Sequence, residues 1–569
     1  MLVTELPTAK HKGVIPDQIL YKLLSEGQYL EEKQLKIALE KATSQKKSLY
    51  DTLIELDLVS DENLGKLYAD FLQIPFISLT KVSIPDATLQ IVPELVARKQ
   101  KIIVFEKSKA GLKLATSNPE NKDPIEFIAK KSGEKVMVYY ATERDLDNTL
   151  SLYKKQLESA FDELLKEQIE KADQGVSEAP IAKIVDLLIT YAYDNKASDI
   201  HIEPAEAQTS IRFRIDGVLH DVLSLPKKFH DQVISRIKVL AKLRTDEHLK
   251  AQDGKLQVNM EKEEVDVRVS IVPIVDGEKC VMRILSARSR QFSLSDLGIN
   301  NEDLYKVKNG FEKPYGMVLS TGPTGAGKTT TIYAILKIIN TREKNIATIE
   351  DPVEYEVEGI NQIQVNPKTN LTFADGLRSI LRQDPDVIFV GEIRDEETAD
   401  IAINSAMTGH LVLSTLHTND AATALPRLID MKVEPFLVAS TVNVIIAQRL
   451  VRKICDKCRV SLTISRSELA KHIPENLIKK YLGSKKEIRG YHGKGCSVCH
   501  LTGYVGRVGL FEILEMSPKI KQLITSKADA DVIKNMAIKE GMLTMLEDGL
   551  EKVINGITTL EEILRVTKS

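Results

Sequence analysis

A glycine-rich stretch between a predicted strand and a predicted helix constrains the fold of this chain more than any other feature. Residues 322–329 read Gly-Pro-Thr-Gly-Ala-Gly-Lys-Thr, after the apolar run 317–319 and before the helical pattern TTTIYAILKIIN. In this spacing, backbone N–H groups can turn inward around phosphate oxygens at the positive end of a helix. An ordinary glycine-rich turn would need neither the strand nor the helix. The stretch therefore predicts a phosphate-binding loop in a parallel α/β sheet.

The residues of this loop have separate predicted roles. The Lys328 ammonium neutralises the outer phosphates of ATP, and the Thr329 hydroxyl is a ligand for Mg²⁺. The full set of predicted nucleotide-binding residues is Gly322, Pro323, Thr324, Gly325, Ala326, Gly327, Lys328, Thr329, Thr330, Asp351 and His410.

Three other predicted strands end in polar side chains. The segment NIATIED ends in Glu350 and Asp351, DVIFVGE ends in Glu392, and LVLSTLHT ends near His417. The carboxyl ends of parallel strands meet at one edge of a sheet, where open α/β folds bind their ligands. A single carboxylate at a strand end is usually solvated, but three such strands beside one phosphate loop favour a catalytic centre. We therefore predict catalytic roles for Glu350, Glu392 and His417.

Glu392 is the strongest catalytic candidate of these three. Enzymes that hydrolyse nucleotides usually carry an aspartate for Mg²⁺ directly after the buried strand, but Gly391 occupies that position here. Magnesium would then depend on Thr329, phosphate oxygens and carboxylates acting through water, which leaves Glu392 to orient or deprotonate the attacking water. The alternative is a plain ion pair between Glu392 and Arg394.

The length and composition indicate a multidomain globular protein. The chain has 569 residues, too many for one core, and its 43% hydrophobic and 28% charged residues are typical of globular domains. A formal net charge of -3 supplies no general attraction to nucleic acid or anionic lipid. The sequence begins without a leader-type apolar segment and contains no run of about 18 apolar residues, so we expect a cytoplasmic protein.

Hydrophobic periodicity divides the chain into helical and mixed regions. The stretches 19–42 and 48–76 look like two copies of one helical unit. Beyond residue 300, strand and helix patterns alternate, which predicts a parallel sheet with crossover helices. We expect an α/β multidomain chain with a tandem helical module at 1–80, a small α/β unit at 81–153, a charged helical linker at 154–178, a second α/β domain at 179–295, and a nucleotide-binding domain at 296–569 that includes a cysteine-containing subdomain at 449–505 and helices at 517–569.

Four of the five cysteines form two Cys-x-x-Cys pairs, Cys455 with Cys458 and Cys496 with Cys499. Four thiolates favour tetrahedral Zn²⁺, so we predict one structural zinc site that both pairs close. The alternatives are free thiols, or haem attachment at the sequence CSVCH, which would leave the first pair without a purpose. The fifth cysteine, Cys280, lies in a strand pattern and is predicted to be a buried apolar side chain.

Several motifs together resemble one protein family. The sequences GPTGAGKTTT, TIEDPVEY, DVIFVGEIRD and TGHLVLSTLHTND follow the order of the phosphate loop, acidic box, second motif and histidine box of the secretion-type traffic ATPases. The segments ASDIHIEP, RFRIDGVL, AQRLVRKIC and TGYVGRVGLFEIL are also similar to that family. Pilus retraction motors of this family lack the long N-terminal region and the cysteine pairs. The chain therefore resembles the type IV pilus extension ATPases most, with the type II secretion ATPases as the alternative.

This resemblance implies a fold and an assembly. The nucleotide-binding domain would be RecA-like, and the domain at 179–295 would be PAS-like and carry two transition-state arginines, Arg268 and Arg283. The alternative for these two residues is a pair of surface arginines. The chain would form a homohexamer at the cytoplasmic face of the inner membrane. ATP hydrolysis would move an inner-membrane platform protein, with peripheral pilus assembly proteins as further partners, so that pilin subunits join a growing fibre.

The N-terminal module departs from one pattern of the family. There, tandem helical repeats can bind cyclic di-GMP through an Arg-Leu-Gly opening in each repeat. Here the repeats open with Gln18-Ile19-Leu20 and Ser48-Leu49-Tyr50, so both lack the arginine and the glycine. We therefore expect the module to dock on a membrane partner rather than to bind cyclic di-GMP.

A ring helicase or DNA-uptake motor is a second class that uses a phosphate loop in a ring. The basic run Arg449-Leu450-Val451-Arg452-Lys453 could favour it, but charge beside a zinc site is more often a solvated face. The chain has no tryptophan and is near neutral, so we expect no nucleic-acid partner. A scaffold that binds nucleotide without hydrolysis is a third class, and Lys328, Glu392 and the paired arginines argue against it.

Overall fold

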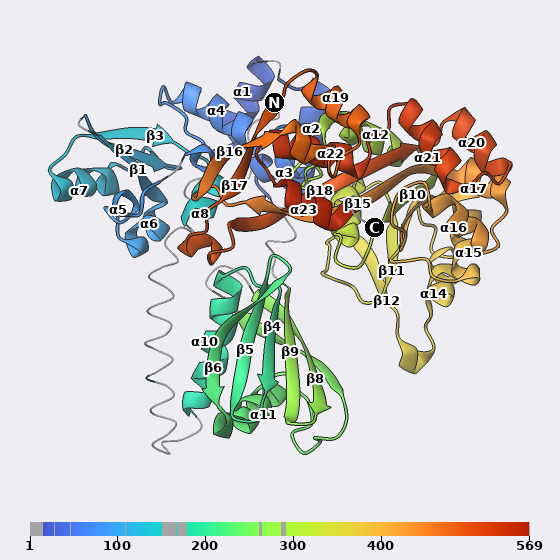
Figure 1. Cartoon of the computed structure of the whole chain (residues 1–569), viewed down its shortest axis with the longest axis horizontal. Helices are drawn as coiled ribbons and strands as arrows, with labels where there is room; N and C mark the ends of the chain where they lie inside the picture. The colour runs from blue at the N-terminus through green and yellow to red at the C-terminus, as the bar shows by residue number, and fades with distance from the viewer. Residues whose placement is uncertain are drawn as a thin grey trace. The chain divides into compact units, whose positions relative to one another are not determined.

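The computed structural model describes residues 15–150 except 28, 46, 83 and 109, together with 167, 179–260, 264–285 and 292–567. Apart from Glu167, the charged linker predicted at 154–178 lies outside these residues. The chain divides into two compact units. Unit 1 contains the described residues of 1–152 and 292–569, and unit 2 contains those of 153–291. Figure 1 labels most of the helices and strands of both units.

Unit 1 begins with four helices that follow the two predicted repeats. Ser48 and Ser60 cap the third and fourth helices, each accepting a hydrogen bond from the backbone N–H three residues ahead. Apolar side chains such as Leu20, Leu24 and Leu53 fill the core between the helices. The helices are α1 (Asp17–Glu26), α2 (Glu32–Gln45), α3 (Leu49–Glu55) and α4 (Asp61–Phe71).

A small α/β segment follows these helices, as the strand and helix patterns predict. β1 and β2 form an antiparallel hairpin, and β3 adds to β2 in the parallel direction. The elements are η1 (Leu79–Lys81), α5 (Asp86–Leu89), α6 (Glu94–Gln100), β1 (Ile102–Ser108), β2 (Gly111–Thr116), α7 (Lys122–Ser132), β3 (Val136–Tyr140) and α8 (Glu143–Leu150).

The largest part of unit 1 is built on a seven-stranded sheet. Its strand order is β12-β11-β13-β14-β10-β15-β18, and neighbouring strands are parallel except for the last pair. The sequence patterns located β10, β11, β13 and β14 but missed the other three strands. The strands are β10 (Gly316–Thr321), β11 (Ile346–Glu350), β12 (Ile360–Gln364), β13 (Val387–Val390), β14 (Leu411–Leu416), β15 (Val442–Ile454) and β18 (Tyr504–Glu515).

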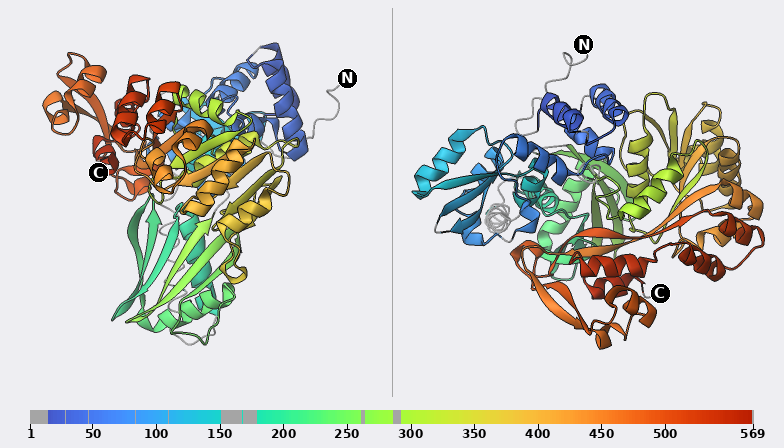
Figure 2. Two further views of the ribbon diagram at one scale, coloured as in Figure 1. Left: turned by 90° about the vertical axis from the view of Figure 1, so that its right-hand side faces the viewer. Right: turned by 90° about the horizontal axis from the view of Figure 1, so that it is seen from above.

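Helices cover both faces of this sheet (Figure 2). Buried side chains of α12 and α13 share one cluster with Val318, whereas α14 to α17 share another with Met317 and Leu319. Because both faces are covered, every residue of the inner strands β10, β11, β13 and β14 is buried, and charged groups are left at the strand ends. The helices are α12 (Asn301–Phe311), α13 (Lys328–Ile339), α14 (Phe373–Ile380), α15 (Glu396–Met407), α16 (Ala424–Asp430) and α17 (Pro435–Thr441).

The remainder of unit 1 contains a small hairpin and the C-terminal helices. β16 and β17 pair in the antiparallel direction, and their apolar side chains, such as Ile464, join the core beneath the large sheet. Among the described residues, none of the helices combines the length and apolar character needed to cross a bilayer. The elements are β16 (Arg459–Ser465), α18 (Arg466–Leu469), α19 (Glu475–Leu482), β17 (Glu487–Gly493), η6 (Ser497–Cys499), α20 (Pro518–Thr525), α21 (Ala530–Lys539), α22 (Met545–Ile554) and α23 (Leu560–Thr567).

Unit 2 is a six-stranded antiparallel sheet of order β6-β5-β4-β9-β8-β7 with helices on one face. Ile200 and Ile202 of the central strand pack against α10 and α11, while the alternate residues Asp199, His201 and Glu203 lie on the other face. The sequence patterns indicated these strands and α10 but missed α11. The elements are α10 (Ala179–Asp194), β4 (Asp199–Pro204), β5 (Gln208–Ile215), β6 (Val218–Pro226), η3 (Lys227–Phe229), α11 (His230–Leu240), β7 (Gln252–Asn259), β8 (Glu264–Ile274) and β9 (Gly277–Leu285).

The predicted fold class, an α/β multidomain chain with a parallel sheet, is confirmed by this architecture. The domain boundaries given above stay predictions.

Candidate active site and cysteine cluster

The predicted phosphate loop joins β10 to α13, with glycines at the positions where its backbone turns. Gly322, Gly325 and Gly327 have φ of 147°, 77° and 89°, in the region that side chains other than glycine rarely adopt. The Lys328 Nζ donates to the carbonyl oxygens of Gly322 at 2.7 Å and Pro323 at 3.3 Å. The loop thus closes around its own lysine at the start of a helix.

The other loop residues lie where a ligand could reach them. Pro323, Thr324 and Gly325 are exposed, Ala326 is buried, and Thr329 and Thr330 are half-buried in the first turn of α13. Burial lowers the pKa of the Lys328 ammonium, and the charge of the Glu392 carboxylate opposes this shift. Lys328 and Glu392 therefore lie close enough to interact, although 64 residues separate them in the sequence.

Strand register brings three of the predicted catalytic residues to one edge of the sheet. Ile349 of β11 pairs with Val390 of β13, and Val390 pairs with Ser414 of β14. Glu350, Glu392 and His417 follow these positions closely and lie at the carboxyl ends of their strands, as the sequence predicts. β14 pairs directly with β10, which leads into the phosphate loop.

Glu392 contacts a histidine and an arginine. Its Oε2 lies 3.1 Å from His417 Nε2, and its Oε1 lies 2.6 Å from Arg394 Nη2. The ion pair with Arg394 that formed the alternative interpretation is thus present, beside the histidine contact. The two residues after Glu392 line a pocket of about 380 Å³, which is formed by Ile393, Arg394, Leu416, His417, Arg427 and Met431.

Gly391 allows the strand ends to approach each other. A Cβ at this position would lie 3.3 Å from the Glu350 Cα and 3.3 Å from the Ile349 carbonyl oxygen. The Thr415 hydroxyl donates to the Gly391 carbonyl oxygen at 2.7 Å, which fixes the backbone just before Glu392. Close packing of the strand ends therefore explains why glycine occupies the position of the usual aspartate.

Glu350 is buried and enclosed by neutral hydrogen-bond donors. Tyr333 Oη donates to its Oε2 at 2.5 Å, while Thr348 Oγ1 and Gln362 Nε2 donate to its Oε1 at 2.6 and 3.2 Å. Burial raises the pKa of Glu350, and the hydrogen bonds only partly oppose this shift. Asp351, by contrast, is exposed. The catalytic role predicted for Glu350 stays a prediction.

His410 is not brought to this edge. It precedes β14, its carbonyl oxygen accepts from the N–H of Gly316 at the start of β10, and its Nδ1 lies 2.9 Å from the Ser405 carbonyl oxygen. Gly316 and Leu411 pair at one end of these strands and Thr321 and Leu416 at the other, where the phosphate loop begins. His410 therefore lies at the amino end of the sheet.

Arg268 and Arg283 lie opposite each other on β8 and β9 of unit 2. The Arg283 Nε donates to Asp199 Oδ1 at 3.0 Å, and 62% of the Arg283 side chain is exposed. On the same face, Arg212 donates to Glu203 at 2.8 Å. The two predicted transition-state arginines are thus neighbours on a charged face of the sheet.

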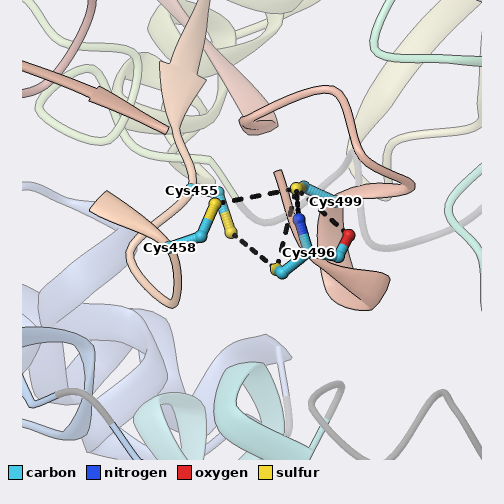
Figure 3. Close-up of side chains that lie close together, drawn as sticks. All are labelled: Cys455, Cys458, Cys496 and Cys499. Carbon is cyan, nitrogen blue, oxygen red and sulfur yellow. Dashed lines mark hydrogen bonds between the residues drawn. The ribbon is translucent and has the colours of Figure 1, made fainter. Parts of the chain in front are cut away.

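The two cysteine pairs meet in one cluster (Figure 3). All four sulfur atoms lie within 4.8 Å of one another. The closest approaches are 3.7 Å between Cys496 and Cys499, and 3.8 Å both from Cys455 to Cys496 and from Cys458 to Cys499. Backbone N–H groups of Cys496 and Gly503 donate to the Cys499 sulfur at 3.1 and 3.3 Å. This arrangement fits one tetrahedral cation.

The surroundings of the cluster also fit a metal. Burial is the main cause that raises the pKa of the Cys455 and Cys458 thiols, and a bound divalent cation would favour their thiolate forms instead. Haem attachment would engage only Cys496 and Cys499, whereas the fold gathers all four sulfurs. Cys280 lies apart, fully buried in unit 2, where burial raises its pKa to about 12, as predicted for an apolar side chain.

The basic run before the first cysteine pair is largely engaged within the protein. The Arg452 guanidinium lies 2.7 Å from Glu562 and 4.2 Å from the Tyr504 ring centre, and Arg449 contacts Asn419 at 3.4 Å. These contacts favour a structural role for Arg449 and Arg452.

The sequence analysis missed the residues that surround Glu350. Tyr333 lies in the helix after the phosphate loop and Gln362 lies on the edge strand β12, and neither forms part of a local motif. Only the pairing of β11 with β12 places Gln362 near Glu350, so no spacing within one segment could have indicated it.

Comparison with known proteins gives a consistent result. Residues 174–565 match the family model described as Type II/IV secretion system protein, and residues 72–160 match the model of the MshEN domain. The chain is 36% identical over 562 residues to the type IV pilus assembly ATPase PilB of Myxococcus xanthus, covering 96% of this chain and 98% of that protein.

Two further similarities complete this picture. The chain is 39% identical over 531 residues to the type II secretion system protein E of Xanthomonas campestris pv. campestris, covering 90% of this chain and 92% of that protein. Among solved structures, the ATPase DotB of Yersinia pseudotuberculosis superposes with a TM-score of 0.51 at 22% identity, covering 69% of this chain and 94% of that one. The latter similarity concerns the fold.

Proposed function

The chain belongs to the type II/IV secretion system protein family, and we propose that it is a motor ATPase that drives type IV pilus extension. The observation that carries this proposal is that the loop ending in Lys328 leaves β10 at the same edge of the parallel sheet at which Glu392 and His417 lie 3.1 Å apart. A phosphate-binding lysine beside a carboxylate that can act on water is the minimum that ATP hydrolysis requires.

The residues divide the chemical work as follows. Lys328 and the N–H groups of the loop bind the β- and γ-phosphates, and Thr329 would hold Mg²⁺, which neutralises phosphate charge when bound. Glu392 orients or deprotonates the attacking water, and His417 holds the Glu392 carboxylate in place. Arg268 and Arg283 stabilise the charge that develops on the transferred phosphoryl group.

Replacement of the proposed base tests this mechanism. Glu392→Gln keeps the shape of the side chain but removes the proton acceptor, so we expect kcat for ATP hydrolysis to fall about 10²- to 10⁴-fold with nucleotide binding retained. Both quantities can be measured on the purified full chain by phosphate release and titration calorimetry.

A matched control is Glu396→Gln. Glu396 lies four residues after Glu392, and its exposed carboxylate pairs with Lys432 at 2.7 Å. We expect its turnover to stay within about threefold of wild type, because exposed ion pairs contribute little. Turnover within threefold of wild type in Glu392→Gln itself would contradict the assignment.

We further propose that Cys455, Cys458, Cys496 and Cys499 bind one structural Zn²⁺ ion. Metal analysis of the freshly purified protein should find about one zinc per chain. Cys496→Ser should lose the metal and lower the Tm, whereas Cys280→Ala should keep the metal because that cysteine lies outside the cluster. A visible haem absorption band, or no zinc in the wild type, would overturn this proposal.

The proposed working form is a homohexamer at the cytoplasmic face of the inner membrane. It would act on a platform protein in that membrane, with peripheral assembly proteins as further partners. Support comes from the similarity to a named pilus assembly ATPase over almost the whole chain. Gene deletion followed by electron microscopy should remove pili from the cell surface.

A type II secretion ATPase is the second candidate function, favoured by the 39% identity to a type II secretion system protein E. Under this alternative, the deletion strain keeps its pili and retains exoproteins within the cell. The same strain therefore distinguishes the two machines.

We propose that the N-terminal module docks on a membrane-bound partner. The MshEN match covers 72–160, beyond the four helices, and the openings of both helical repeats lack the arginine and glycine expected for cyclic di-GMP. Titration with cyclic di-GMP should give no saturable heat, and tight saturable binding would replace docking by signal recognition.

A further inference from the structure

Gln448 is a buried polar residue that comes beside the phosphate loop from a strand distant in the sequence. It lies on β15, whose parallel register pairs Ala447 with Thr321, so residue 448 stands level with the first residue after β10. Only 2% of its surface is exposed. A buried amide requires partners for both of its ends, so its contacts reveal what it stabilises.

The Gln448 side chain joins three parts of the phosphate site. Its Nε2 donates to the Ala326 carbonyl oxygen at 2.8 Å. Its Oε1 accepts from the Thr331 hydroxyl at 2.8 Å and from the Ser320 hydroxyl at 3.3 Å. Because a carbonyl oxygen only accepts, the nitrogen end of the amide must face Ala326. One side chain therefore ties the loop to the strand before it and the helix after it.

Two loop glycines leave the space that Gln448 occupies. A Cβ on Gly322 would lie 2.4 Å from the Gln448 carbonyl oxygen, and a Cβ on Gly327 would lie 3.1 Å from its Nε2. A backbone contact as close as 2.4 Å excludes any side chain at Gly322. The glycines thus serve the approach of Gln448 as well as the turns of the loop.

The hydrogen bond to Ala326 controls the direction of a neighbouring donor. The Ala326 carbonyl and the Gly327 N–H belong to one peptide unit, and in a trans peptide these groups point in opposite directions. A donor that holds the carbonyl on one side therefore turns the N–H to the other side. In phosphate loops, such N–H groups are the ones that contact phosphate oxygens.

We propose that Gln448 is a positioning residue for nucleotide binding, which fixes the Ala326–Gly327 peptide so that the Gly327 N–H is available to a nucleoside diphosphate or triphosphate. Gln448 acts through this peptide and does not touch the nucleotide. This inference rests on the proposed function, because it needs a phosphate-bearing ligand in the loop.

The experiment compares two single variants of the full chain. Gln448→Glu keeps an acceptor for Thr331 and Ser320 but loses the donor to Ala326. Thr331→Val removes the hydroxyl contact and leaves the Ala326 contact in place. We expect ADP binding, measured by titration calorimetry, to weaken about 10- to 100-fold in Gln448→Glu and less than about threefold in Thr331→Val.

Lowering the pH provides a readout that a purely structural role would not change. A protonated glutamic acid can donate where the glutamine donates, and burial favours the protonated form of a carboxyl group. The loss of ADP affinity in Gln448→Glu, relative to wild type, should therefore shrink between about pH 8 and about pH 6. Gln448→Met cannot donate at any pH and should keep its loss, and it also replaces Gln448→Glu if that variant does not fold.

The possible results of these experiments separate the role of Gln448 from the proposed function. Wild-type ADP affinity in Gln448→Glu or Gln448→Met overturns the inference. Equal losses of affinity and of Tm in Gln448→Glu and Thr331→Val also overturn it, because they indicate a packing role alone. If the wild-type chain binds neither ADP nor ATP, the proposed function fails instead, independently of the variants.

Discussion

The two large sheets of this protein place their charged side chains in different ways. In the parallel sheet, helices cover both faces, and charged groups such as Glu350 and Glu392 gather where strands end. In the antiparallel sheet, the described helices of unit 2 pack on one face, and on the other face Asp199 of a central strand lies within 4 Å of both Arg214 and Arg283. Strand direction and burial together thus decide whether charge collects at an edge or spreads over a face.

The two units also differ in how each surrounds a buried carboxylate, Glu350 in unit 1 and Glu278 in unit 2. Glu350 accepts hydrogen bonds from neutral groups, and burial raises its pKa. Burial also tends to raise the pKa of Glu278, but hydrogen bonds and charge from Lys238 and His248 outweigh it and lower the pKa. Lys238 is fully buried and its Nζ lies 2.7 and 2.9 Å from the two Glu278 oxygens. The surroundings of Glu350 therefore favour its protonated form, and those of Glu278 favour its charged form.

The largest expected effect tests whether the charged face of unit 2 contributes to catalysis. We expect Arg283→Ala to lower kcat for ATP hydrolysis about 10³-fold while ATP binding is retained, because a transition-state arginine contributes to the rate and little to the ground state. The control is Arg212→Met on the same face, whose partner Glu203 also contacts Lys279 at 2.7 Å. Its turnover should stay within about threefold of wild type. Near-normal hydrolysis by Arg283→Ala would show that Arg283 only forms an ion pair on this face and has no catalytic role.

A smaller effect is expected from removing the buried cation of unit 2. Lys238→Met leaves the Glu278 charge with only a half-exposed histidine partner, and breaking a buried ion pair typically costs about 3 to 5 kcal/mol in the free energy of unfolding. Hydrogen exchange resolved by peptide should show this loss in unit 2 and little change in unit 1. Lys255→Met, at an exposed position of the same sheet, should change the free energy by less than about 0.5 kcal/mol. Equal exchange rates in wild type and Lys238→Met would contradict the assigned stabilisation.

The smallest expected effect is a pair of pH dependences with opposite sign. The folded-state pKa of Glu350 is raised, so its contribution to stability is complete below the unfolded value near 4.5 and is lost as pH rises through the folded value. The folded-state pKa of Glu278 is lowered, so its contribution is present above 4.5 and is lost as pH falls through the folded value.

Two variants separate these contributions. Relative to wild type, we expect Glu350→Gln to gain stability and Glu278→Gln to lose it as the pH is raised from about 4 to about 7. Urea unfolding monitored in each unit by hydrogen exchange can measure both slopes. Slopes of the same sign would show that the two carboxylates do not differ as their surroundings indicate.

The sequence predicted those features that depend on short spacing. The phosphate loop, the strand ends at Glu350 and Glu392, and each of the two Cys-x-x-Cys pairs are local patterns, and the structure forms each of them. His410 shows where such reasoning stops, since a histidine box predicts proximity for both of its histidines. His410 and His417 flank a six-residue strand, so an extended backbone separates them to opposite ends of the sheet.

Contacts between distant strands could not be predicted in this way. Gln448 reaches the phosphate loop because β15 lies beside β10, and Gln362 reaches Glu350 because β12 lies beside β11. In unit 2, Lys238 and Glu278 meet although 40 residues separate them. An apolar run indicates a strand but does not indicate its neighbour, so the residues that support the site stay hidden until strand order is known.

One consequence concerns β15, which passes from the phosphate loop to the cysteine cluster. Cys455 follows its last residue, seven positions after Gln448, which corresponds to about 23 Å of extended chain at about 3.3 Å per residue. Pairing with β18 continues along this segment as far as Ile454, whereas pairing with β10 ends at Ala447. A single continuous strand thus joins the residue that contacts the phosphate loop to the first cysteine of the cluster, so a displacement of the cluster along the strand would also displace Gln448.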